Sequence, residues 1–91
     1  GGIFIEIGIK CLNDFYPYIY DKFRNIKIVS QDEHNTVVKL EVFEDGFIKW
    51  LMSQSTDMLT VLYPERTITK IRQETRKLMS KYGGEGEWQK K

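Results

Sequence analysis

The sequence has very little of the residue types that build metal sites, disulfides and most catalytic centres. Of its 91 residues, one is cysteine and one is histidine. A single cysteine excludes an intramolecular disulfide, and tetrahedral zinc sites usually need three or four Cys or His ligands. His34 lies in the polar segment 31–35, which is typical of a solvated hairpin turn. We therefore expect no metal, no cofactor and no enzymatic activity.

Long apolar runs are also missing. No run approaches the ~20 residues that a membrane-spanning helix needs. The N-terminus lacks the basic stretch followed by an apolar region that marks a signal peptide. We therefore expect a cytoplasmic protein without membrane contacts. The net charge of +1 gives no overall case for nucleic acid, so any such case depends on how charges are distributed locally.

Composition and length indicate one small globular domain. The chain is 41% hydrophobic and 13% aromatic, which is globular rather than disordered composition. Residues 1–2 are both glycine, and we interpret them as a processing scar or as the edge of a domain cut from a longer protein. Residues 83–91 are rich in glycine and charge, which predicts a flexible tail. The folded domain is expected to cover residues 3–82.

Hydrophobic periodicity predicts seven elements in the order β-α-β-β-α-β-α. Period-2 and β-rich segments predict strands over 3–10, 26–31, 36–42 and 58–63. Spacings of three and four predict helices over 14–24, 44–54 and 64–82, with Asn13 or Asp14 as the first N-cap. This order predicts an α+β fold, a ferredoxin-like βαββαβ sandwich with an additional C-terminal helix. The last helix must dock on a flank of the sandwich or on a partner.

Five carboxylates lie in or next to the predicted hairpin of strands 26–31 and 36–42. Paired carboxylates can do acid–base work, but exposed turns and a helix start also explain them through capping and solubility. We expect the second account for all five. They are Asp32, Glu33, Glu41, Glu44 and Asp45.

The last predicted helix carries a basic stripe, defined by Arg66, Lys70, Lys77 and Lys81. Such a stripe could follow a phosphate backbone and bind a nucleic acid or effector in a salt-dependent way. The alternative is an ordinary solvated helix face.

The fourth predicted strand is apolar on both faces, although it should lie at a sheet edge. A surface strand normally has one polar face. The excess predicts that its second face is covered, either by the last helix or by another chain in a dimer. The candidate interface residues are Met58, Leu59, Val61 and Tyr63.

Three segments resemble the C-terminal extension (WCX) domain of WYL-domain bacterial transcription regulators. They are the strand 37–42, the helix segment 47–53 with Trp50, and the strand 60–64 that ends at Pro64. Tyr82 takes the place of the tyrosine that closes the last helix of that family. The resemblance covers about residues 3–82.

The resemblance implies a non-catalytic regulatory domain. Family members are cytoplasmic regulators with a winged helix-turn-helix, a central WYL domain that senses the effector, and this extension. The extension helps to form the dimer and closes over the effector site, where some members bind single-stranded DNA. A homo-oligomer built by the full-length regulator and a single-stranded nucleic acid effector are therefore the implied partners. This segment alone is not expected to bind operator DNA. The alternative is a stand-alone ferredoxin-like domain that binds a small molecule or forms a homodimer.

Overall fold

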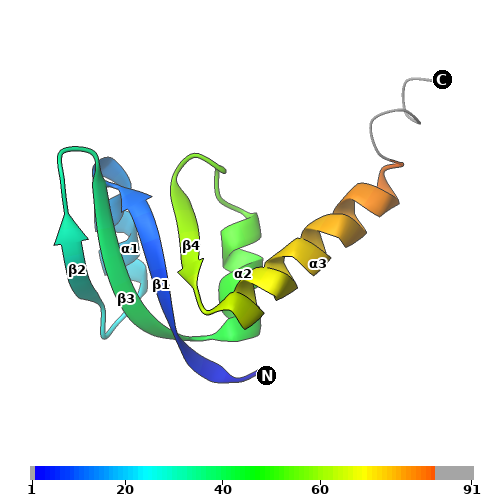
Figure 1. The fold of residues 1–91 in the computed structure, drawn as a ribbon, viewed down its shortest axis with the longest axis horizontal. Helices are drawn as coiled ribbons and strands as arrows, with labels where there is room; N and C mark the ends of the chain where they lie inside the picture. The colour runs from blue at the N-terminus through cyan, green and yellow to red at the C-terminus, as the bar shows by residue number, and fades with distance from the viewer. Residues whose placement is uncertain (1, 84–91) are drawn as a thin grey trace.

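The computed structural model describes residues 2–83, which form a four-stranded sheet with helices beside it (Figure 1). The predicted α+β class is confirmed, and every predicted helix and strand is present. The elements in chain order are β1 Phe4–Leu12, the 3₁₀ turn η1 Asn13–Phe15, α1 Tyr16–Lys22, β2 Lys27–Gln31, β3 Asn35–Phe43, α2 Glu44–Met52, β4 Leu59–Tyr63 and α3 Glu65–Lys81.

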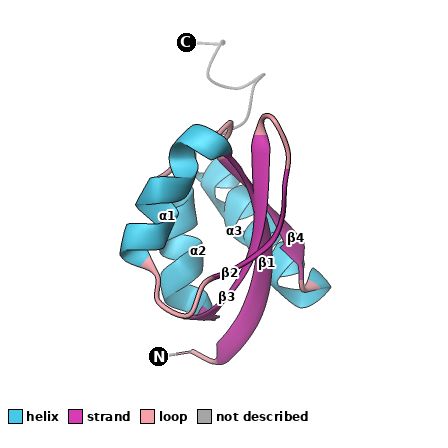
Figure 2. Ribbon diagram, turned by 90° about the vertical axis from the view of Figure 1, so that its left-hand side faces the viewer, coloured by secondary structure: helices cyan, strands magenta, loops and turns pink. Residues whose placement is uncertain are grey.

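The sheet has the strand order β2-β3-β1-β4, and every neighbouring pair is antiparallel. β1 and β3 are the long central strands, and Ile7 lies opposite Leu40 in their register. The connection from β1 to β2 passes over β3, and the connection from β3 to β4 passes over β1. Figure 2 shows α1 and α2 together on one face of the sheet. Within residues 2–83, neither α1 nor α2 covers the other face, which we call the open face.

The core lies between the sheet and these two helices. Alternate residues of β1 and β3 point into it because successive strand side chains point to opposite faces. Each fully buried aliphatic or aromatic side chain contributes roughly 1.5–3 kcal/mol relative to exposure. The buried apolar residues are Ile7, Ile9, Cys11, Ile19, Val38, Leu40, Val42, Phe47, Ile48 and Leu59.

The first helix begins later than the sequence predicts, because Asn13 does not cap it. Its side-chain amide donates to the backbone oxygens of Asp32 and Glu33, each at 3.0 Å. Its amide oxygen accepts from the buried hydroxyl of Thr36 at 2.7 Å. The amide therefore joins the end of β1 to the β2–β3 turn, and α1 starts only at Tyr16.

The last helix docks on the flank of the sheet. α3 starts directly after the edge strand β4 and then runs obliquely away from that strand, beyond the rest of the domain (Figure 1). Thr67 is its one fully buried residue within the described part of the chain, and Ile71 packs against the core. The C-terminal half of α3 therefore extends into solvent.

Tyr63, at the end of β4, lies across the open face of the sheet. It pairs with Gly8 at a register shift, and its hydroxyl donates to Glu6 at 2.9 Å. A Cβ atom added at Gly8 would lie 2.0 Å from the nearest ring carbon of Tyr63. Gly8 is therefore required for the close approach of the Tyr63 ring to β1.

We expect Gly8→Ala to lower the free energy of unfolding by about 1–3 kcal/mol, because the ring of Tyr63 must move away from Glu6. Urea unfolding followed by circular dichroism measures this change. Gly46→Ala is the matched control. Nothing lies within 4 Å of a Cβ atom there, so removing a helical glycine should stabilise α2 by about 0.5–1 kcal/mol. Equal effects of the two variants would contradict the proposed packing of Tyr63.

Candidate functional site

A buried carboxylate fixes the start of α3 to the start of α2. Glu44 is the first residue of α2 and is 1% exposed. Its Oε2 accepts from the Thr67 hydroxyl at 2.6 Å, and its Oε1 accepts from Arg66 Nη2 at 2.9 Å and from Lys70 Nζ at 3.1 Å. We call these four residues the Glu44 clamp. The prediction that capping and solubility explain this carboxylate is wrong for Glu44, because it makes no cap hydrogen bond and the first two turns of α3 cover it.

The electrostatics of the clamp favour an ionised Glu44. Burial of the carboxyl group opposes ionisation, but hydrogen bonds from Thr67, Lys70 and Arg66 outweigh burial and lower the pKa of Glu44 below its ordinary value of 4.5. Lys70 Nζ also lies 3.0 Å from Asp45 Oδ1. The hydrogen bond to Asp45, and after it the hydrogen bond to Glu44, raise the pKa of Lys70. The clamp is therefore a charged network at neutral pH.

The clamp divides the predicted basic stripe. Arg66 and Lys70 point to Glu44, so much of their charge is neutralised within the domain. Lys77 Nζ lies 3.1 Å from Glu74, an exposed pair of the kind that contributes little. Lys81 Nζ lies 5.9 Å from the ring centre of Tyr82. The outer half of the stripe, Lys77 and Lys81, thus has the better access to a polyanion.

An apolar groove of about 340 Å³ lies where the end of α2, the strand β4 and the middle of α3 meet. Its lining combines buried and half-buried aliphatic side chains with exposed residues from the end of α2 and from the loop that follows it. The lining residues are Leu51, Met52, Gln54, Ser55, Thr56, Leu59, Thr60, Val61, Ile68, Ile71 and Thr75. The groove was not predicted, because it depends on the angle at which α3 leaves β4.

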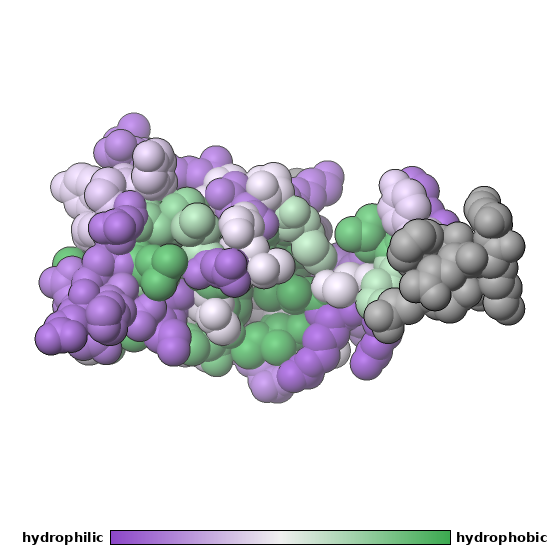
Figure 3. Space-filling view, turned by 90° about the horizontal axis from the view of Figure 1, so that it is seen from above, coloured by the Kyte–Doolittle hydropathy of each residue, from purple (hydrophilic) through white to green (hydrophobic). Residues whose placement is uncertain are grey.

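The apolar stripe of α3 continues from this groove into solvent. Ile68 and Ile71 line the groove, whereas Leu78 is 53% exposed and Tyr82 is 69% exposed. Met79, next to them, is 56% exposed. Figure 3 shows hydrophobic atoms on the projecting part of the molecule, beside the grey residues. The groove and the exposed apolar residues thus lie along the same helix, with Thr75 between them.

The four candidate interface residues of the fourth strand lie in different surroundings. Leu59 is in the core, and Met58 and Val61 are half-buried against it. Tyr63 lies on the open face. The pKa of its phenol is raised mainly by burial, and further by the hydrogen bond to Glu6 and the negative charge of that carboxylate. Intramolecular packing therefore explains most of the apolar character of this strand, and an interface through these residues stays a prediction.

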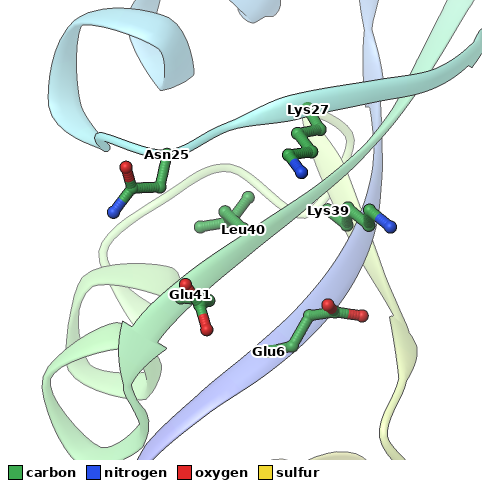
Figure 4. Close-up of a pocket in the computed structure, with 6 residues that line it drawn as sticks. All are labelled: Glu6, Asn25, Lys27, Lys39, Leu40 and Glu41. Atoms are coloured by element: carbon green, nitrogen blue, oxygen red, sulfur yellow. The ribbon is translucent and has the colours of Figure 1, made fainter.

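The open face of the sheet holds a charged hollow of about 340 Å³ (Figure 4). Its charged side chains come from β1, β2 and β3 and are of both signs: Glu6, Lys27, Lys39 and Glu41. Alternating charges favour water over an anionic or cationic ligand. We therefore place the candidate functional site at the apolar surface of α3 instead.

Neither of the two residues considered for chemistry lines this surface. Cys11 is buried in the core, and burial raises the pKa of its thiol. His34 is exposed in the β2–β3 turn, as predicted, where Asp32 accepts from the backbone amides of His34 and Asn35. Within residues 2–83, no three Cys, His, Asp or Glu side chains are grouped to hold a metal ion. No helix of that part is both long and apolar enough to cross a membrane.

Comparison with known proteins adds nothing to this description. No family model, curated protein or solved structure matches the chain. The functional conclusion therefore depends on the residues and geometry described above.

We expect Glu44→Gln to lower the free energy of unfolding by about 1–3 kcal/mol at pH 7, because it removes the charge that Arg66 and Lys70 surround. The lowered pKa of Glu44 also sets the sign of the pH dependence. Its contribution is complete above pH 4.5 and is lost as the pH falls through the folded-state pKa. The difference between wild type and variant should therefore shrink below pH 4.5 in urea unfolding experiments.

Asp45→Asn is the matched control, since Asp45 is half exposed and shares only Lys70 with the clamp. Its effect should stay below about 1 kcal/mol. A difference between Glu44→Gln and wild type that does not change with pH would show that the charge of Glu44 is not what holds α3.

Proposed function

We propose that this chain is the C-terminal extension domain of a WYL-type helix-turn-helix regulator, and that it acts there as a non-catalytic regulatory and dimerisation domain of the cytoplasm. One observation carries the proposal. Two of the segments that resemble this family, 47–53 and 60–64, contribute the helix end and the strand that border the apolar groove. The family-like residues thus border the apolar groove from which the exposed end of α3 projects.

We infer that the domain is a ferredoxin-like sandwich with α3 as an added helix. The support is the antiparallel order β2-β3-β1-β4, together with two helices on one face. β1 and β2 run parallel through the α1 crossover, and β3 and β4 run parallel through the α2 crossover. These are the two interleaved βαβ units of that fold.

The apolar surface supports a role in protein contacts. Exposed apolar surface that continues over several elements usually marks an interaction site. In a regulator, such a surface would carry a contact to another domain or to a second copy. The single-stranded nucleic acid effector stays a prediction, and its best-placed residues are Lys77 and Lys81 at the outer end of the same helix.

The coding sequence that precedes residue 1 tests the proposal directly. We expect it to encode a winged helix-turn-helix followed by a WYL domain in the same reading frame. Deleting residues 3–83 from that full-length protein should weaken its dimer in analytical ultracentrifugation, because this deletion removes the apolar surface. An upstream sequence that encodes neither domain would contradict the assignment.

The groove itself favours a second candidate function, a domain that binds a small apolar molecule. Its volume of about 340 Å³ is at the lower end of the range of ligand pockets, roughly 300–1,000 Å³. This function predicts that an apolar ligand at about 100 times its Kd stabilises the wild type by roughly 2.7 kcal/mol in thermal unfolding.

Met52→Asp, at the rim of the groove, should abolish this stabilisation by the ligand. Lys49→Asp, on the same helix but outside the groove, should preserve it. If a panel of aliphatic and aromatic compounds leaves the unfolding midpoint of the wild type unchanged, small-molecule binding is excluded for those chemical classes.

A further inference from the structure

The apolar stripe of α3 has the spacing of a helix-pairing seam. Its members recur at alternating intervals of three and four residues, the interval that keeps one face of a helix against another helix. They are Ile68, Ile71, Thr75, Leu78 and Tyr82. We call this set the α3 seam.

The domain itself covers only the first half of the seam. Ile68 and Ile71 are half-buried where the groove begins, whereas Leu78 and Tyr82 lie on the part of α3 that runs beyond the body (Figure 1). Within the described residues, no other element reaches that outer half. Ile71 and Thr75 of the seam also line the groove. One molecule therefore presents both an apolar helix end and an apolar groove beside the same helix.

We propose that a second copy of this chain covers the seam, with its α3 packed antiparallel against the first. Thr75 of each copy then packs against the partner's Leu78. The partner's Tyr82 reaches Ile71 and enters the open groove. The two helices overlap over residues 71–82, about 18 Å. This inference rests on the proposed dimerisation function and names the surface that performs it.

Charge complementarity supports the antiparallel direction. Glu74 and Lys81 both flank the seam on the same side, seven residues apart. Antiparallel pairing in this register brings Glu74 beside the partner's Lys81, and two-fold symmetry repeats the contact. Parallel pairing would instead bring Glu74 beside the partner's Met79. Opposite charges beside a seam select partner and orientation more than they add affinity.

The shape of the molecule favours the same direction. β4 and α2 lie beside the N-terminal half of α3, so the body occupies one end of the helix (Figure 1). Antiparallel pairing places the two bodies at opposite ends of the helix pair, where they do not collide. Parallel pairing would place both bodies beside the same end. The antiparallel contact is also self-complementary, as a closed two-fold interface requires.

Disulfide trapping tests the register. Glu74→Cys and Lys81→Cys variants of the 91-residue chain are purified separately, mixed, and oxidised. We expect a disulfide-linked dimer in the mixture and little in either variant alone. In this register two identical cysteines lie about 7.5 Å apart along the helix axis at position 74 and about 13.5 Å apart at position 81, too far for a disulfide. Wild type, with only the buried Cys11, is the background control.

Sedimentation equilibrium tests the surface independently. Leu78→Asp should raise the dimer dissociation constant by at least about tenfold, because a charge would enter the apolar seam. Ser80→Asp, on the opposite face of the same helix, should change the dissociation constant less than about twofold. Both substitutions are at exposed positions, so circular dichroism should show the wild-type fold.

A monomeric wild type at high concentration would overturn the proposal, and so would a dimer that Leu78→Asp leaves intact. A dimer that is sensitive to Leu78→Asp but gives no cross-link in the mixture would overturn the antiparallel register. These outcomes are separate from the test of the proposed function. A chain without upstream regulator domains can still form this dimer, and a true regulator segment can fail to form it.

Discussion

The ionised carboxylate of Glu44 is the interaction on which the rest of the functional surface depends. It lies at the start of α2, where the helix dipole favours an anion, and it receives three side chains from the first two turns of α3. α3 has little else to fix it, since Thr67 is its one fully buried residue in the described part of the chain. The direction of α3 decides both where the groove opens and where the outer half of the seam points.

A charged group in this position stabilises one geometry more than it stabilises folding as a whole. A buried ion pair loses hydration free energy that largely offsets its Coulomb attraction. Here the cations stay partly in water, which reduces that loss, and the Thr67 hydroxyl satisfies a remaining lone pair. No buried side-chain nitrogen or oxygen in residues 2–83 lacks a partner. An apolar substitute for Glu44 could fill the space, but it would leave Thr67, Arg66 and Lys70 without this acceptor.

Local patterns were enough to predict the helices, the strands and the α+β class, because each element carries its own periodicity. The alternating isoleucines of β1 and the three- and four-residue spacing of α3 indicated their elements without any tertiary information. The burial and hydrogen-bond partners of individual polar residues were not predictable in the same way. Glu44 and Asp45 are adjacent acids at a helix start, yet only Glu44 is covered. That difference arises from a helix more than twenty residues later, so nothing local to Glu44 signals it.

The candidate site was predictable only in part for the same reason. The sequence indicated the basic and apolar stripes of α3, but it could not show that Arg66 and Lys70 turn inward to Glu44 while the apolar stripe runs outward. Both stripes lie on α3, which is attached to the domain through its N-terminal half. The inner and outer halves of each stripe therefore have different surroundings. The residues of the inner half hold the helix against the domain. The outer half, with Leu78, Tyr82 and the charges beside them, stays exposed within the described part of the chain, which is why we propose it as the contact surface.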